Sequence, residues 1–237
     1  MQTTPLSEDI RQALSKVTTA SITTILLKKG LRNVWMRGTR PIKPGQGRLV
    51  GRAFTLRFVP AREDLATPES WGSPISTRAA IEAMPEGVIV VADSMGTTDA
   101  GIFGDILCAR MAKKKVAGLV TDGVMRDMAG VLATGLAVWC QGAAAPPSVA
   151  GLTFVNWQEP IGCGGVAVFP DDVVVVDDDG AVLIPKALVE AVAKEGQEQE
   201  RLEGWIMSEL ERGVPLPGLY PPNDEAKARY ASFKEKK

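Results

Sequence analysis

The chain has 237 residues and a formal net charge of −1 from 27 basic and 28 acidic side chains, so it lacks the electrostatic footprint of a general nucleic-acid-binding protein. With 45% hydrophobic residues, it is long enough to bury the core of one large domain or two small ones. It contains no histidine, which excludes Ser-His-Asp and Cys-His catalysis and imidazole-ligated zinc, and leaves carboxylates, Arg, Lys, Tyr, Cys or an oxygen-ligated metal.

The N-terminal part predicts one helix, one strand and one long loop. Ser7 can cap a helix that we expect over residues 7–29, with acidic residues in its first turn. A strand is predicted over residues 49–59. Residues 60–75 predict a long polar loop, a feature that is often functional in a compact domain.

Helices and strands alternate through the middle of the chain. Helices are expected over residues 76–84, 104–114 and 124–134, and strands over residues 87–92, 116–121 and 136–140. This alternation predicts a core built on a parallel sheet.

Short strands dominate the next part. They are expected over residues 152–157, 166–169, 173–176 and 181–184. The run Asp177-Asp178-Asp179-Gly180 looks like a metal-binding run, but Asp-Gly between two apolar strands is a strong hairpin signal, and we interpret it as a turn.

Pro185 begins a long helix that extends to about residue 212, and a Pro-rich tail covers residues 213–237. No linker interrupts the chain. We therefore expect a single α/β domain over residues 1–237, with its core at about 15–212.

The cellular setting follows from the remaining composition. Cys108, Cys140 and Cys163 are widely spaced and indicate reduced thiols rather than a disulfide framework. The N-terminus carries acids where a secretion signal would be basic and then apolar, and no apolar run approaches the about 18 residues of a membrane span. We expect a cytoplasmic protein with no membrane or nucleic-acid partner.

One stretch concentrates residues suited to chemistry. Gly101 and Gly104 lead into a predicted helix whose N-terminus offers free N–H groups and a positive dipole end to an anion. Asp122, Arg126 and Asp127 follow the next strand, where open α/β sheets place their ligands. Arg pairs with carboxylates and Asp binds hard divalent cations. The pattern indicates a small oxo-acid bound with a metal, but it also suits a helix cap and a surface ion pair.

The spacing Asp105-x20-Arg126-Asp127, within FGDILCARMAKKKVAGLVTDGVMRD, resembles the family of 4-hydroxy-4-methyl-2-oxoglutarate aldolases and the regulator of ribonuclease activity A. The segment PIGCGGVAVFPDDVVVVDDDGAVLIP over residues 160–185 supports the resemblance, which spans about residues 15–210. It implies a swivelling β/β/α-type fold and assembly into a homotrimer or homohexamer with sites between subunits.

The resemblance also implies roles for individual residues. Asp127 would ligate Mg²⁺ or Mn²⁺, Arg126 would bind the keto oxygen or carboxylate of a small 2-keto acid, and Asp105 would orient water on the metal. The backbone amides that would hold the substrate carboxylate belong to Gly104, Asp105, Ile106 and Leu107.

A glutamate from the C-terminal helix of a neighbouring subunit would complete the site. Glu195, Glu198 and Glu200 are the candidates, and we favour Glu198. The predicted helix over residues 186–212 is longer than in regulator-type members, which favours an enzyme.

The implied activity is that of a class II aldolase, a lyase that cleaves a 4-hydroxy-2-keto acid such as 4-hydroxy-4-methyl-2-oxoglutarate to pyruvate. Oxaloacetate decarboxylation needs the same enolate. Two alternatives remain: a non-catalytic regulator that binds a ribonuclease, and a dehydratase or hydratase acting on sugar-derived 2-keto acids. A Schiff-base mechanism is disfavoured because the lysines lie at apparent helix ends.

Overall fold

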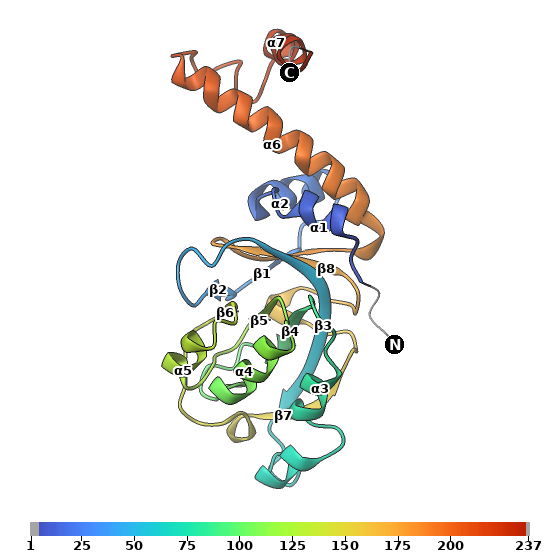
Figure 1. Cartoon of the computed structure of the whole chain (residues 1–237), viewed down its shortest axis with the longest axis vertical. Helices are drawn as coiled ribbons and strands as arrows, with labels where there is room; N and C mark the ends of the chain where they lie inside the picture. Colours follow the sequence, from blue (N-terminus) through green and yellow to red (C-terminus); the bar gives the residue numbers. More distant parts are fainter. Residues whose placement is uncertain (1–4, 236–237) are drawn as a thin grey trace.

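A computed structural model describes residues 5–235 (Figure 1). The strands are β1 (Trp35–Met36), β2 (Arg40–Pro41), β3 (Leu49–Pro60), β4 (Ile89–Asp93), β5 (Gly118–Thr121), β6 (Val138–Cys140), β7 (Leu152–Trp157), β8 (Val173–Asp177) and β9 (Gly180–Ile184). The α-helices are α1 (Glu8–Leu14), α2 (Thr19–Lys28), α3 (Thr77–Ala83), α4 (Asp105–Lys113), α5 (Met128–Ala133), α6 (Val189–Glu211) and α7 (Asp224–Lys234). Among these residues no helix is both long and apolar enough to span a bilayer.

The strands form one mixed sheet in the order β1-β9-β8-β3-β4-β5-β6-β2, with β7 also paired to β3. The long strand β3 connects its two parts. Residues 49–52 pair antiparallel with β8, whereas residues 53–57 pair parallel with β4. Because β4, β5 and β6 continue in parallel, the parallel core expected from the alternating pattern is confirmed.

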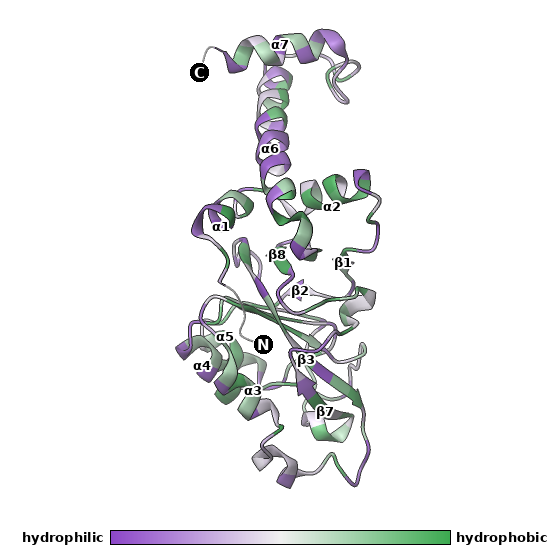
Figure 2. Ribbon diagram, turned by 90° about the vertical axis from the view of Figure 1, so that its right-hand side faces the viewer, coloured by the Kyte–Doolittle hydropathy of each residue, from purple (hydrophilic) through white to green (hydrophobic). Residues whose placement is uncertain are grey.

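Helices cover the sheet in two separate groups. Helices α3, α4 and α5 contribute to a core beneath the parallel strands that includes Ile81, Met111 and Val131. Helices α1, α2 and α6 pack against β8 and β9 through residues such as Leu26 and Val192. The rest of α6 extends away from the body, and α7 lies across its far end (Figure 2).

The single helix predicted over residues 7–29 is wrong, because the chain forms α1 and α2 with a turn between them. The Thr18 side chain accepts a hydrogen bond from the Ser21 amide and so begins a new helix. Glu200 in turn accepts hydrogen bonds from the Thr18 amide and hydroxyl, at 2.9 and 3.1 Å. A threonine in the middle of a helical pattern therefore acts as a cap.

Three C-terminal predictions also need correction. The strand expected over residues 166–169 is reduced to a single bridge between Ile161 and Val168, since residues 163–165 form a 3₁₀ turn. Helix α6 begins at Val189, after a short 3₁₀ segment at 186–188. The tail predicted from composition contains the helix α7.

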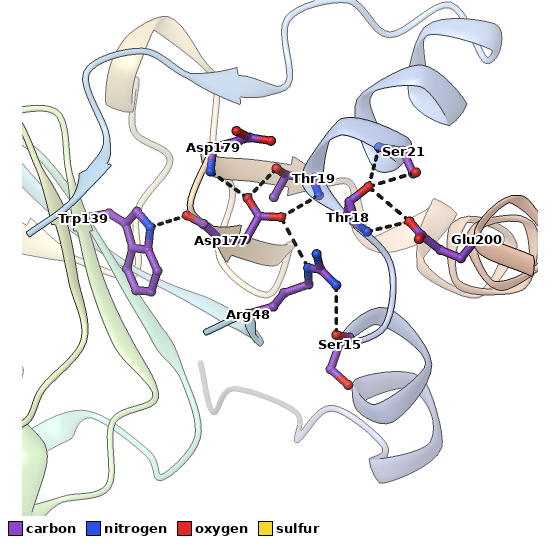
Figure 3. Close-up of polar contacts among 9 residues, drawn as sticks. All are labelled: Ser15, Thr18, Thr19, Ser21, Arg48, Trp139, Asp177, Asp179 and Glu200. Atoms are coloured by element: carbon purple, nitrogen blue, oxygen red, sulfur yellow. Dashed lines mark hydrogen bonds and ion pairs between the residues drawn. The ribbon is translucent and has the colours of Figure 1, made fainter. Parts of the chain in front are cut away.

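The Asp-rich run is a turn, as predicted: β8 and β9 form a hairpin that closes at the pair Asp177–Gly180. Asp177 also joins distant parts of the fold (Figure 3). Its buried carboxylate accepts hydrogen bonds from the Thr19 amide at 2.9 Å and hydroxyl at 2.6 Å, and pairs with Arg48 Nε at 3.3 Å. Its carbonyl oxygen accepts a hydrogen bond from Trp139 Nε1 at 2.7 Å.

Replacing Asp177 with alanine is expected to lower the free energy of unfolding by about 3–5 kcal/mol, because Arg48 and Thr19 lose a shared buried partner. Urea denaturation followed by circular dichroism measures this loss. Asp179→Ala is the matched control: the Asp179 side chain is exposed in the same turn, and the expected change is within about 0.5 kcal/mol. Equal losses in the two variants would contradict the assigned role of Asp177.

Candidate active site

Asp105, Arg126 and Asp127, three of the residues predicted to carry chemistry, lie around one cavity of about 290 Å³. Gly104 is the N-cap of α4, and Asp127 is the N-cap of α5. Residues 104–107 and Arg126 line the cavity together with Asp127. Segments separated by about twenty positions in the sequence are thereby brought to one place.

Two backbone hydrogen bonds hold these segments together. The Ile102 amide donates to the Val124 carbonyl at 3.0 Å, and the Arg126 amide donates to the Phe103 carbonyl at 2.9 Å. The loop that follows β5 therefore runs directly beside the segment that enters α4.

Asp127 has an uncommon backbone conformation, with φ 51° and ψ 43° in the left-handed region. This conformation costs a non-glycine residue roughly 1–2 kcal/mol, although Asp tolerates it better than most. Its side chain makes no capping hydrogen bond within the described part of α5. Strain of this kind is frequent at functional sites.

Arg126 and Asp127 form a half-exposed pair. Arg126 Nε lies 3.1 Å from Asp127 Oδ2, and the two side chains are 35% and 48% exposed. Among residues 5–235, the Nη groups of Arg126 have no hydrogen-bond partner. They remain available for an oxygen of a bound acid.

The N-terminus of α4 presents unsatisfied amides to the cavity, because no side chain among the described residues caps this helix. One amide is already engaged: Ile106 N donates to Asp105 Oδ1 at 2.7 Å. An anion that uses the Ile106 amide therefore has to displace the Asp105 carboxylate.

Glycines leave room for both carboxylates. A Cβ atom at Gly104 would lie 2.6 Å from Asp127 Oδ2, and one at Gly130 would lie 2.7 Å from Asp105 Oδ2. Any other residue at these positions would push the carboxylates aside. Gly130 has no local sequence signal, because only the packing of α5 against α4 gives it this role.

Gly104→Ala is expected to displace Asp127 and reduce the affinity for a divalent cation about 10- to 100-fold. Titration with Mn²⁺ measures the affinity, and thermal unfolding checks that the fold persists. Gly204→Ala is the control, because a Cβ there meets open space on α6. Unchanged Mn²⁺ affinity in Gly104→Ala would argue against Asp127 as a metal ligand.

The donor set fits a largely hydrated hard cation. The cavity offers the carboxylates of Asp105 and Asp127, and within residues 5–235 no group of three or more Asp, Glu or Cys side chains is arranged as a metal cage. Mg²⁺ typically keeps several waters and binds through one or two carboxylates. The residues present therefore suit Mg²⁺ or Mn²⁺ better than zinc.

The candidate glutamates lie on α6, away from α4 and α5 of the same chain (Figure 1). Glu195 pairs with Lys29 at 2.6 Å, and Glu200 caps α2. Glu198 accepts hydrogen bonds from Tyr230 at 3.2 Å and Lys234 at 2.7 Å, and the Lys234 ammonium lowers the pKa of Glu198. The structure does not bring any of the three to the cavity of its own chain, and a role in a neighbouring subunit stays a prediction.

Asp122 does not line this cavity. Its buried carboxylate accepts hydrogen bonds from Ser94, at both amide and hydroxyl, and from the Gly164 amide at 3.0 Å. It joins two loops, which makes its role structural.

The cysteines are buried. Burial raises the pKa of the Cys108 thiol to about 12 and also raises the pKa of Cys140. Neither supplies a thiolate near neutral pH.

Sequence reasoning missed several side chains of the cavity wall, among them Trp71, Arg78 and Ser148. Only the length of the loop predicted over residues 60–75 pointed toward this region. Nothing in the pattern around Arg78 distinguishes it from an ordinary surface arginine on a helix.

A model of the RraA-like family, described as Aldolase/RraA, matches residues 14–183. The chain belongs to the RraA-like family. The matched region includes Asp105, Arg126 and Asp127, so the family membership expected from their spacing is confirmed.

One related protein is named as an aldolase, and another has a name that states no activity. A Halalkalibacterium halodurans protein, provisionally named a 4-hydroxy-4-methyl-2-oxoglutarate aldolase, is 32% identical over 72% of this chain and 75% of its own length. Protein DlpA of Legionella pneumophila is 28% identical over 65% of this chain, a match that spans only 25% of the length of DlpA.

Solved structures share the architecture. Streptomyces coelicolor RraAS2, described as an unusual member of the RNase ES inhibitor RraA protein family, has 30% identity and a TM-score of 0.77, covering 85% of this chain and 97% of its own. An uncharacterized Pseudomonas syringae protein at 24% identity has a TM-score of 0.78 over 92% of this chain and 99% of its own. The expected α/β fold with a long C-terminal helix is thereby confirmed.

Proposed function

We propose that the protein is a divalent-metal-dependent lyase that cleaves a 4-hydroxy-2-keto acid, such as 4-hydroxy-4-methyl-2-oxoglutarate, to pyruvate. The observation that carries this proposal is the single cavity shared by the uncapped N-terminus of α4, Arg126 and the carboxylates of Asp105 and Asp127. The names of related proteins point to the same chemistry.

Each part of the cavity has a role in binding the substrate. The amides at the start of α4 hold its C1 carboxylate, and Arg126 donates to the keto oxygen through its free Nη groups. Asp127 holds the cation, with Gly104 leaving space for its carboxylate. A divalent cation bound there supplies a Lewis acid for the 2-keto group.

Bond cleavage requires a base and a stabilised negative charge. Asp105 takes the proton of the C4 hydroxyl, directly or through one water, while the electrons of the C3–C4 bond move toward C2. Arg126 stabilises the charge that develops on the keto oxygen. Protonation of C3 then yields pyruvate. Decarboxylation of oxaloacetate generates the same enolate and suits the same residues.

The assembly we propose is a homotrimer or homohexamer in which Glu198 of one subunit reaches the cavity of another. Support comes from α6, the helix that carries Glu198, because it lies away from α4 and α5 of its own chain (Figure 1).

A ribonuclease-binding regulator is the second candidate, favoured by the similarity to RraAS2. A dehydratase acting on sugar-derived 2-keto acids would use the same anion-binding groups. The cavity and its paired carboxylates favour the lyase over the regulator, because a binding protein has no need of them.

Arg126→Ala and Asp127→Ala are each expected to lower pyruvate formation from 4-hydroxy-4-methyl-2-oxoglutarate at least about 100-fold, because Arg126 stabilises the charge on the keto oxygen and Asp127 holds the cation. Pyruvate release is followed by a coupled dehydrogenase assay with Mg²⁺ and again with EDTA. EDTA is expected to abolish activity, and added Mg²⁺ to restore it.

Arg110→Ala is the matched control, because Arg110 lies on the same helix α4 in an exposed pair with Glu82, outside the cavity. Full activity in EDTA, or in either cavity variant, would rule out the proposed mechanism. Absence of turnover of any 2-keto acid, combined with tight ribonuclease binding, would favour the regulator.

A further inference from the structure

A second arginine lines the candidate active site. Arg78, near the start of α3, contributes to the same cavity wall as Arg126 and the N-terminus of α4. Its guanidinium carbon lies 4.8 Å from the centroid of the Trp71 ring. In the part of the chain that the structure describes, no carboxylate lies within ion-pair distance of Arg78.

Trp71 limits the freedom of this arginine. The residue belongs to a 3₁₀ turn (Pro68–Gly72) in the loop before α3, and its ring borders a second hollow of about 390 Å³ toward β7. A guanidinium stacked on an indole ring is attracted to the ring face and loses part of its conformational freedom before any ligand binds. Arg78 is therefore held in place at the cavity.

The charges of the cavity wall favour a doubly charged ligand. Among residues 5–235, the acidic and basic side chains that line it are Arg78, Asp105, Arg126 and Asp127, and their formal charges sum to zero. The divalent cation that Asp127 is proposed to hold leaves a charge of +2. A dicarboxylate neutralises this charge, whereas a monocarboxylate leaves it half balanced.

Arg78 has no role in the substrate contacts proposed so far. The amides of α4 are assigned to the C1 carboxylate, and Arg126 is assigned to the keto oxygen. The guanidinium of Arg78 remains, and its paired N–H groups suit a second carboxylate. We propose that Arg78, held by Trp71, binds the distal carboxylate of a 2-keto diacid and selects diacids over monoacids. This inference rests on the proposed function for the orientation of the substrate.

The test compares two five-carbon acids that differ in one carboxylate, 2-oxoglutarate and 2-oxopentanoate. Neither has a C4 hydroxyl, so neither is a substrate for aldol cleavage. Isothermal titration of the full chain with excess Mg²⁺ is expected to show 2-oxoglutarate binding at least about tenfold more tightly. In Arg78→Gln this preference is expected to fall below about threefold, with little change for 2-oxopentanoate.

Two further variants separate recognition from folding. Arg78→Lys keeps the charge and is expected to retain part of the preference, although it loses the paired hydrogen bonds. Arg62→Gln is the matched control: Arg62 lies in the same loop region but is paired with Asp64 at 2.8 Å, so its loss leaves the preference unchanged.

Equal binding of the two acids by the unmodified protein would overturn the inference. Equal weakening of both acids in Arg78→Gln would also overturn it, because a purely structural role predicts that result. An Arg78-dependent preference in a protein that cleaves no 4-hydroxy-2-keto acid would support the inference while removing the lyase proposal.

Discussion

The close approach of two loops at the ends of β4 and β5 is the contact on which the candidate site depends. Gly101 forms a parallel bridge with Val124, and a Cβ atom at Gly101 would lie 2.8 Å from the backbone nitrogen of Arg126. Because no side chain separates the loops, the amides of α4, the guanidinium of Arg126 and the carboxylate of Asp127 share one cavity. A parallel sheet makes this possible, since it places both loops at the same edge.

This arrangement is held at an energetic cost. Asp127 occupies a left-handed conformation, and the first turn of α4 has no side-chain cap among the described residues. Either feature would weaken an ordinary helix start by about 1 kcal/mol. Contacts elsewhere offset the cost, chiefly the apolar core under the parallel strands and the buried hydrogen bonds of Asp177. The stability of the body therefore outweighs the local cost of the site.

Much of the fold follows from local pattern. The alternation over residues 76–140 predicted the parallel core because each buried strand is a short apolar run. Prediction was wrong where a distant partner competes with local preference. Thr18 interrupts the N-terminal helix with help from Glu200. Glu200 is far from Thr18 in the sequence, so no local pattern reveals this contact.

The sequence by itself pointed to Asp105, Arg126 and Asp127 as candidate site residues, because their spacing is a local feature of one strand and its flanking turns. The absence of histidine had already excluded imidazole-based catalysis and imidazole-ligated zinc. Only the tertiary structure decided that Arg78 and Trp71 join them, and that the glutamates of α6 lie away from the cavity of their own chain. Such contacts arise from the packing of elements far apart in the chain, which leaves no mark on nearby residues.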